Sequence, residues 1–293
     1  MKVRYNFVDY IIIATLVLIG FICLIPILNA IAISMSDKTA AAMGEVLFIP
    51  KRFTTAAYDE IIKEGRFFHA FGISLQRVAL GVTLNTGLAI LMAYPLSKSP
   101  QQFRMRNVYM WILIFTMLFN GGLIPTFLLV KELGMINTIW SLVLPGAVSV
   151  YNVIILMNFN KGIPPSLEES ALIDGANPLQ ILLHIYIPLA KASIATISLF
   201  SMVYHWNEFF MGKIYINTLD MQPLQTYIQG LSVAISTQQM ASMTPEEIIR
   251  KLAVSNITFN SAKAIVSMIP VVIVYPFLQR FFVTGIVMGA VKE

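Results

Sequence analysis

Long apolar stretches alternate with shorter polar connections along the chain, a pattern that predicts several membrane crossings. A membrane-spanning helix needs about 20 consecutive, mainly apolar residues. Six stretches meet or approach this length, at about residues 10–34, 71–96, 107–130, 136–159, 189–210 and 262–281. The fifth is the weakest, because Glu208 ends its uncharged core, and the sixth lies between Lys263 and Arg280, whose long side chains would have to reach the membrane surface. The pattern predicts an all-α integral membrane protein with six transmembrane helices in one domain, residues 1–293.

Prolines occur inside several of these stretches, at positions 26, 95, 125, 145 and 270. Neighbouring helices in a bundle can satisfy the backbone groups that a proline frees. Packing kinks are therefore the favoured interpretation of these prolines, and hinges are the alternative.

The composition agrees with a membrane protein. Of the 293 residues, 57% are hydrophobic and 12% are charged, whereas about a quarter of a soluble chain is charged. The net charge of +5 fits loops beside anionic membrane lipid better than nucleic-acid binding. Cys23 is the single cysteine, so an intrachain disulfide is excluded and a metal cluster is not expected. Residues 10–36 carry no charge, a longer run than a signal-peptide core, and are interpreted as a retained span.

Charge in the short connections predicts which side faces the cytoplasm. Short cytoplasmic loops are enriched in lysine and arginine. The connection after the second expected span holds Lys98, Arg104 and Arg106 without an acid, whereas the connection after the third holds only Lys131 and Glu132. Both termini and the segment between spans four and five are therefore expected in the cytoplasm.

Two longer loops, residues 37–66 and 211–261, are expected on the outer side. Residues 54–65 are typical of a short surface helix that leads into the second span. In the later loop Thr244 can cap a helix and Pro245 fits the first helical position, so a helix is expected to begin there.

A polar segment at residues 161–188 interrupts the apolar pattern between spans four and five. Pro164 and Pro165 prevent a helix from continuing out of the fourth span. Ser166 is a favourable N-cap, and Glu169 three residues later completes a capping-box pattern. A short helix is expected to begin here.

The same segment contains the signals for a turn and a second helix. The first helix is expected to end near Asp174, because Gly175 can adopt the left-handed conformation that terminates helices. Asn177 can cap a second helix and Pro178 can begin it, and the fifth span follows Pro188. The sequence predicts a stiff helix-turn-helix that can transmit a displacement.

The order of residues in this segment resembles the EAA motif in permease subunits of bacterial ABC importers. That motif reads E-A-A, then G, then I-x-L-P at a fixed spacing. The matching residues here are Glu169, Ser170, Ala171, Gly175, Ile185, Ile187 and Pro188. The approach to the second span, the sequence WNEF and the tail QRFFVTG are similar to carbohydrate-type permeases of the maltose-permease class, and within it to importers of oligosaccharides or polysaccharides such as alginate.

The resemblance implies the MetI-like ABC importer permease fold, with a cytoplasmic coupling helix between helices 4 and 5. That helix, residues 168–174, would dock into a cleft of a separate ATP-hydrolysing subunit. Glu169 would meet a basic group of the ATPase or would act only as a helix cap, since both roles need the same carboxylate. The residues that the resemblance assigns to ATPase coupling are Glu168, Glu169, Ser170, Ala171, Asp174, Gly175 and Pro188.

The resemblance also implies partners and a location. The chain would import a carbohydrate, an oligosaccharide, across the bacterial cytoplasmic (inner) membrane. It would pair with a second permease, usually a different chain, with two ATP-binding subunits and with an extracytoplasmic solute-binding protein. ATP and magnesium would bind the ATPase, and no cofactor is expected on this chain. The outer loop at residues 220–260 would contact the binding protein or would be solvated.

The sequence contains no Walker loop and no zinc-protease or serine-hydrolase motif, so an enzyme is not expected. A stand-alone secondary carrier is one alternative, but expected spans one, three and four lack Asp, Glu, Lys and Arg, which ion-coupled carriers usually keep in the membrane. A membrane enzyme acting on lipid-linked sugar is another. It would need an acidic cluster, and the available one is Glu168, Glu169 and Asp174, whose spacing better fits a turn and a cap.

Polar and aromatic residues inside the spans are candidates for the substrate pathway. Sugars stack on aromatic rings and hydrogen-bond to amides, so the expected lining residues are Tyr204, Trp206, Asn207, Glu208, Asn120 and Asn152. Alternatively, Trp206 is an aromatic residue of the membrane interface, and Glu208 marks the end of a span. Asn120 and Asn152 could instead connect neighbouring helices by hydrogen bonds.

Overall fold

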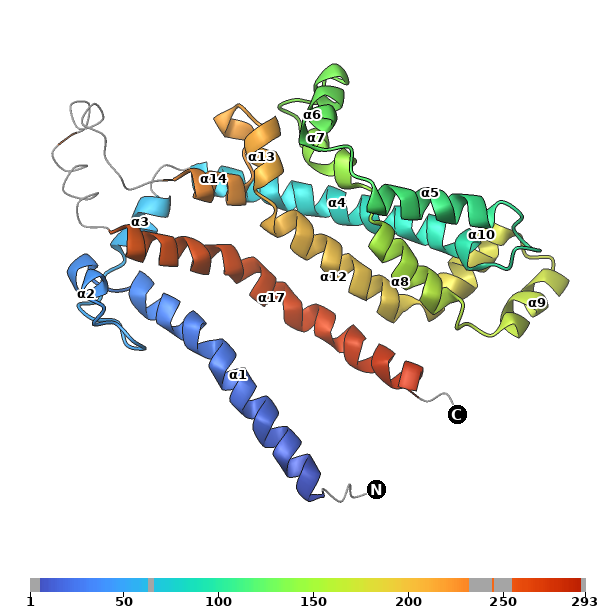
Figure 1. The fold of residues 1–293 in the computed structure, drawn as a ribbon, viewed down its shortest axis with the longest axis horizontal. Coiled ribbons are helices and arrows are strands. Elements are labelled where there is room, and N and C mark those ends of the chain that lie inside the picture. Colours follow the sequence, from blue (N-terminus) through green and yellow to red (C-terminus); the bar gives the residue numbers. More distant parts are fainter. Residues whose placement is uncertain (1–5, 63–65, 232–243, 245–254, 291–293) are drawn as a thin grey trace. The chain divides into compact units, whose positions relative to one another are not determined.

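The computed structural model describes residues 6–62, 66–231, 244 and 255–290, and the regular secondary structure of these residues is helical, without strands (Figure 1). The helix expected to begin at Thr244 lies outside the described residues. The longer helices are α1 (Phe7–Ser34), α4 (Arg66–Ser97), α5 (Arg106–Leu118), α6 (Leu123–Glu132), α8 (Val150–Asn160), α12 (Lys191–Asn207) and α17 (Asn256–Ala290). The shorter helical elements are α2 (Lys38–Ala42), α3 (Ala56–Ile62), α7 (Ile139–Val143), η1 (Leu144–Gly146), α9 (Pro165–Ile173), α10 (Pro178–Ile181), η2 (Leu182–Tyr186), α11 (Ile187–Leu189), α13 (Phe210–Tyr215), η3 (Leu219–Met221) and α14 (Leu224–Gly230).

The chain divides into two compact units. Unit 1 combines Met1–Phe68 with Ile228–Ile269, and unit 2 combines His69–Tyr227 with Pro270–Glu293. Every residue predicted to couple to an ATPase or to line the substrate pathway belongs to unit 2.

Among the described residues, three helices are long and apolar enough to cross a membrane by themselves. They are α1 with 28 residues, α4 with 32 residues and the Asn256–Pro276 part of α17. They overlap the first, second and sixth expected spans. Three further apolar stretches each consist of two helices that meet at a bend, so the described residues provide up to six spans if each bent pair is counted once.

The third expected span, residues 107–130, is not a continuous helix. Its two parts, α5 and α6, are bent by 112° relative to each other. Gly122 precedes α6 with φ +91°, a conformation that favours glycine. The side-chain oxygen of Asn120 accepts a hydrogen bond from the Gly122 N–H at 2.9 Å. Asn120 therefore stabilises the break between the two helices.

The fourth expected span is also bent, and a further bend precedes the fifth. The stretch Ile139–Gly146 meets α8 at 49°, and the stretch Pro178–Leu189 meets α12 at 82°. Ser149 caps α8, because its hydroxyl accepts a hydrogen bond from the Asn152 N–H at 3.4 Å. Bent helices at membrane depth are tolerated where protein or a water-filled cavity satisfies the free backbone groups.

In unit 1, polar contacts hold the chain that follows α1. The hydroxyls of Ser34 and Tyr58 lie 2.7 Å apart and share a hydrogen bond. The side-chain amide of Asn29 donates to the carbonyls of Val46 and Leu47 at 3.1 and 2.7 Å. The short helix expected after this region is present as α3.

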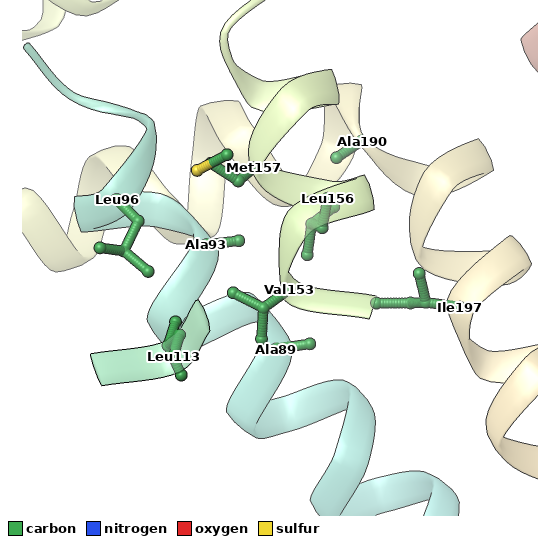
Figure 2. Packing of buried hydrophobic residues seen from close by; sticks show 9 residues of the cluster. All are labelled: Ala89, Ala93, Leu96, Leu113, Val153, Leu156, Met157, Ala190 and Ile197. Atoms are coloured by element: carbon green, nitrogen blue, oxygen red, sulfur yellow. The ribbon is translucent and has the colours of Figure 1, made fainter. Parts of the chain in front are cut away.

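In unit 2, helices α4, α5, α8 and α12 share an apolar core (Figure 2). Ala89 and Ala93 on α4 lie in the same cluster as Val153 and Leu156 on α8. Small side chains let helix backbones approach closely within a membrane. The complete cluster consists of Ala89, Ala93, Leu96, Leu113, Val153, Leu156, Met157, Ala190 and Ile197.

Candidate functional site

The first helix of the polar segment, α9, begins at Pro165, and Pro164 is its N-cap. The prediction that Ser166 caps this helix and that Glu169 completes a capping box is therefore wrong. Proline is favoured at the first helical position because its ring holds φ near the helical value, so the helix begins before Ser166. The Ser166 carbonyl lies inside the helix and accepts a hydrogen bond from the Ser170 hydroxyl at 2.9 Å.

The turn after α9 forms around Gly175, as predicted. Gly175 has φ +81°, in the left-handed region. Its N–H donates to the Leu172 carbonyl at 3.1 Å, and the Ala176 N–H donates to the Ala171 carbonyl at 2.9 Å. These two bonds form a Schellman motif, which satisfies carbonyls at the end of a helix. The left-handed backbone thus favours glycine at this position of the motif.

The second helix of the segment begins at a reciprocal capping box. The Asn177 side-chain oxygen accepts from the Gln180 N–H, and the Gln180 side-chain oxygen accepts from the Asn177 N–H, both at 2.9 Å. Helix α10 continues through the π-helical turn η2 and the short helix α11, which contains Pro188. The predicted cap at Asn177 and helix start at Pro178 are confirmed, whereas the π-helical turn was not foreseen.

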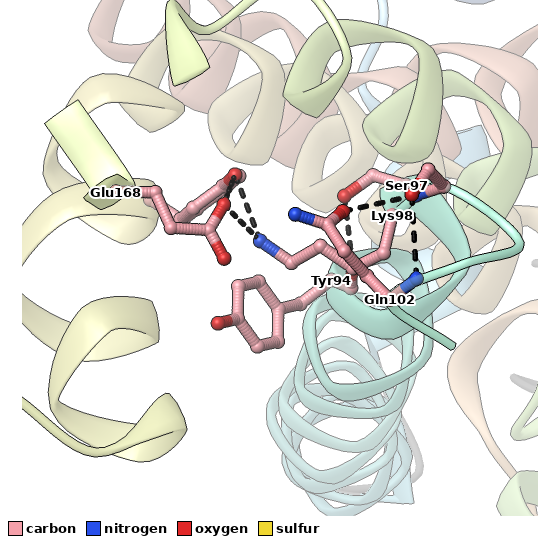
Figure 3. A network of polar contacts seen from close by, with 7 residues as sticks. Tyr94, Ser97, Lys98, Gln102 and Glu168 are labelled. Carbon is pink, nitrogen blue, oxygen red and sulfur yellow. Dashed lines mark hydrogen bonds and ion pairs between the residues drawn. The ribbon is translucent and has the colours of Figure 1, made fainter. Parts of the chain in front are cut away.

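Glu168 of α9 is joined to Lys98, the residue that directly follows α4. The Lys98 ammonium donates to Glu168 Oε2 at 2.5 Å and to the Tyr186 hydroxyl at 2.9 Å, and that hydroxyl donates to Glu168 Oε2 at 2.8 Å. Figure 3 shows Lys98 reaching Glu168 beside the ring of Tyr94. The Lys98 nitrogen lies 4.2 Å from the ring centre of Tyr94 and 4.3 Å from that of Tyr186.

Burial affects the charge states in this cluster. It lowers the pKa of Lys98, while the hydrogen bond and the charge of Glu168 act in the opposite direction. It also raises the pKa of Tyr186 above its ordinary value, and the neighbouring Glu168 adds to that rise. A neutral tyrosine hydroxyl can donate a hydrogen bond, so the raised pKa of Tyr186 keeps its hydroxyl protonated as the donor to Glu168.

The other predicted coupling residues differ from Glu168 in their surroundings. Glu169, Ser170 and Asp174 are exposed, and Ala171 is half-buried. Ile173, at the end of α9, is 86% exposed although it is apolar. Beside this surface lies a hollow of about 330 Å³, lined by Ala171, Asp174, Gly175, Ala176, Gln180, Ile181, His184 and Ile185. The segment thus presents acidic and apolar groups next to a concave surface.

A second feature of unit 2 is a cavity of about 470 Å³ whose lining residues carry no formal charge. It is lined by Asn85, Gly146, Val148, Ser149, Tyr151, Asn152, Phe200, Ser201 and Tyr204. The Asn85 amide donates to the carbonyls of Gly146 and Ala147 at 3.0 and 2.9 Å. The Asn152 amide donates to the Ser201 hydroxyl at 3.1 Å. Hydroxyl, amide and aromatic groups therefore converge on one space, as in many small-molecule sites.

The structure separates the predicted pathway residues into several places. Asn152 and Tyr204 line the cavity. Trp206 is 1% exposed and packs edge-on against Phe71 at 5.8 Å between ring centres. Asn207 is exposed at the end of α12. Glu208 pairs with Arg77 at 2.7 Å, and Asn120 lies at the break before α6.

Several residues at these sites were missed by the sequence reasoning. Asn85 is a polar residue within the apolar run of α4, and Ser149 and Ser201 occupy similar positions in other spans. A search for hydrogen-bonding side chains inside apolar runs would have found them. The pairing of Lys98 with Glu168 joins residues 70 positions apart, and no local pattern indicates it.

Comparisons with known proteins agree with the fold. The family described as "Binding-protein-dependent transport system inner membrane component" matches residues 85–288. The chain is 36% identical over 291 residues to the polygalacturonan/rhamnogalacturonan transport system permease protein YtcP of Bacillus subtilis (strain 168), covering 97% of this chain and 98% of that protein. It is 26% identical to the arabinooligosaccharides transport system permease protein AraQ of Halalkalibacterium halodurans, covering 94% of this chain and 93% of that protein.

A solved structure is similar over nearly the whole chain. It is a chain from the crystal structure of a bacterial ABC transporter involved in the import of the acidic polysaccharide alginate, with 31% identity and a TM-score of 0.80. The similarity covers 96% of this chain and 100% of that one. The MetI-like permease fold expected from the EAA motif is confirmed. The chain belongs to the family of binding-protein-dependent transport system inner membrane components, and it is a multi-pass permease subunit of the ABC importer type and not an enzyme.

Proposed function

We propose that this chain is the permease subunit of an ATP-driven importer that translocates an oligosaccharide delivered by a solute-binding protein. The observation that carries this proposal is the helix-turn-helix at the EAA motif, closed by the Schellman turn at Gly175. Such a rigid element can transmit a displacement made by another subunit. The proposed complex contains a second permease, two ATP-binding subunits that hold ATP and magnesium, and an extracytoplasmic solute-binding protein.

In this proposal the exposed face of α9 docks onto an ATP-binding subunit. Glu169 and Asp174 supply negative charge, and the exposed Ile173 supplies apolar surface. Because α9 is capped by Pro164 without a side-chain hydrogen bond, the Glu169 carboxylate is not used as a helix cap. It is available for a basic group of the ATPase. Docking on this side requires that the segment lies in the cytoplasm, and the six proposed spans then place both termini there too.

The neutral cavity supports a carbohydrate substrate. Sugar hydroxyls both donate and accept hydrogen bonds, as do the amide of Asn152 and the hydroxyl of Ser201, and the rings of Tyr151 and Phe200 can pack against a sugar face. The named relatives belong to transport systems for polygalacturonan/rhamnogalacturonan and for arabinooligosaccharides, and the similar solved structure is of a transporter involved in the import of the acidic polysaccharide alginate. Their shared feature is a chain of sugar units, which is the substrate class proposed here.

Transport into liposomes tests the proposal. The full assembly should take up radiolabelled oligosaccharide only when the binding protein and ATP are both present, and a panel of neutral and acidic oligosaccharides would identify the substrate. A stand-alone carrier would transport without the ATPase and would follow an ion gradient. An enzyme acting on lipid-linked sugar would form a new product instead of accumulating the sugar. Either result would contradict the proposal.

A charge reversal tests the docking face. Glu169→Lys should reduce co-purification of the ATPase, because the new positive charge would repel the basic group of the ATPase that Glu169 is proposed to contact. Glu132→Lys is the matched control, since Glu132 is also exposed but lies at the end of α6. Equal retention of the ATPase by both variants would exclude Glu169 from the interface.

A further inference from the structure

The three polar contacts among Lys98, Glu168 and Tyr186 form a closed ring. We call these three residues, with the ring of Tyr94, the coupling joint. The rings of Tyr94 and Tyr186 meet edge to face, with centres 4.9 Å apart, and the Lys98 ammonium lies over both. The joint connects the end of α4, helix α9 and the π-helical turn η2, which are separate along the chain.

The surroundings of the joint make these contacts stronger than those of an ordinary surface pair. The side chains of Lys98 and Glu168 are 10% and 15% exposed. Reduced exposure to water strengthens an ion pair and its hydrogen bonds, and a lysine over an aromatic face gains further attraction. Glu168 is therefore satisfied within this chain, whereas its neighbour Glu169 is exposed.

We propose that Lys98 is a positioning residue that mechanically joins the docking helix α9 to the transmembrane helix α4. This inference rests on the proposed function, because it requires that an ATPase moves α9. In this arrangement the two adjacent glutamates have different tasks. Glu169 faces the partner subunit, and Glu168 passes the displacement through Lys98 to α4.

Helix α4 connects the coupling joint to the cavity. It runs without a break from Arg66 to Ser97, and Asn85 lies about 18 Å from its end at 1.5 Å per residue. The Asn85 amide is bonded to the backbone carbonyls of Gly146 and Ala147, and Gly146 lines the cavity. A displacement of the Lys98 end of α4 therefore reaches the cavity wall through one continuous helix.

Lys98→Met tests the joint in the full assembly with its ATPase and binding protein. Methionine keeps much of the apolar length of lysine but removes the charge and the donors. The variant should still bind the ATPase and hydrolyse ATP, but sugar transported per ATP hydrolysed should fall about tenfold, the effect of losing a charge-assisted contact. Lys98→Arg should recover most of this ratio, since it restores the cation. Lys131→Met, at an exposed lysine at the end of α6, should not change it.

Two further variants separate coupling from folding. Tyr186→Phe removes only the hydroxyl and keeps the ring, so it should lower the ratio by less than Lys98→Met while the assembly forms normally. The double variant Glu168→Gln, Lys98→Met should lower the sugar transported per ATP little more than Lys98→Met alone does, because the effects of substitutions within one network of contacts are not additive.

The inference is overturned if Lys98→Met and Tyr186→Phe both transport as much sugar per ATP as the wild type. It is also overturned if Lys98→Met no longer binds the ATPase stably but keeps the wild-type amount of sugar transported per ATP. Lys98 would then only maintain the docking surface. A wild-type assembly that shows no ATP-dependent transport would contradict the proposed function itself, so the two failures are distinguishable.

Discussion

Arg77 in α4 and Lys98 directly after it each pair with a glutamate from a distant part of the chain, and the two pairs stabilise different features. Lys98 joins side chains from α9 and η2. Arg77 instead holds backbone, because one guanidinium nitrogen donates to the Glu208 carbonyl at 2.6 Å and another to its carboxylate at 2.7 Å. The Glu208 carboxylate also accepts from the Met211 N–H at 2.7 Å.

The difference indicates two functions for similar charges. Arg77 is 1% exposed and, through Glu208, fixes the break between α12 and α13. Its planar group suits several fixed acceptors at once, whereas lysine is a flexible point charge. The Arg77 pair therefore stabilises a local backbone conformation, and the Lys98 pair joins elements that could move together. Each of the following predictions tests that contrast.

The largest effect is expected for Arg77→Met. The substitution leaves the Glu208 carboxylate and carbonyl without their cationic partner, and removing one member of a buried pair costs about 3–5 kcal/mol. The free energy of unfolding, measured in detergent, should fall by that amount. Arg104→Met, at an exposed arginine in the connection after α4, is the control and should have little effect. If Arg77→Met were as stable as the wild type, Arg77 would not stabilise the fold as proposed.

A smaller loss is expected for Gly81→Ala, four residues after Arg77. A Cβ at Gly81 would lie 2.3 Å from the His205 ring, whereas a Cβ at Gly87 would meet no atom within 4 Å. Overpacking a close helix contact costs about 1–3 kcal/mol, so Gly81→Ala should lower the free energy of unfolding. Gly87→Ala, on the same helix, should be tolerated. Equal stability of the two variants would mean that α4 and α12 are less tightly packed near Arg77 than the structure shows.

Lys98→Met should cost less stability than Arg77→Met, about 1–2 kcal/mol, because its contacts are with side chains that retain other partners. The Tyr186 hydroxyl still donates to Glu168 in this variant. Thermal unfolding of the purified assembly measures this loss of stability, in parallel with the measurement of sugar transported per ATP. A loss as large as that of Arg77→Met would remove the contrast between the two pairs.

The local features of the coupling segment were predictable from the sequence, because caps and turns depend on a few adjacent residues. Gly175 and Asn177 act as their residue types suggest. The cap at Ser166 was predicted wrongly, since Pro165 offered an earlier helix start. The break at Gly122 was missed because both of its flanking helices are apolar, so hydropathy alone does not reveal the bend.

The contacts between distant residues were not predictable in the same way. Asn85 and the pairs of Arg77 and Lys98 depend on which helices become neighbours, and periodicity does not determine this. Glu208 illustrates the limit, since the sequence suggested a pathway residue or the end of a span. The structure places Glu208 at the end of α12, and it adds hydrogen bonds from Arg77 and Met211 that the sequence did not reveal.

The smallest effect is expected for Asn177→Ala. The side-chain oxygen that accepts from the Gln180 N–H is lost, whereas the Gln180 side chain can still accept from the backbone at position 177. Loss of an N-cap costs about 1 kcal/mol. Amide hydrogen exchange in α10 and η2 should therefore become faster.

The same substitution also distinguishes stabilisation by a local helix cap from stabilisation by contacts between distant residues. The exchange of amides in α13, beside Glu208, should stay unchanged, because that region depends on Arg77 and Glu208 and not on Asn177. Asn217→Ala, at an exposed asparagine outside the segment, is the control and should leave α10 and η2 as protected as in the wild type. If Asn177→Ala accelerated exchange around Glu208 as well, the two ends of α4 would respond as a single cooperative unit, and the contrast between a fixed pair and a movable joint would fail.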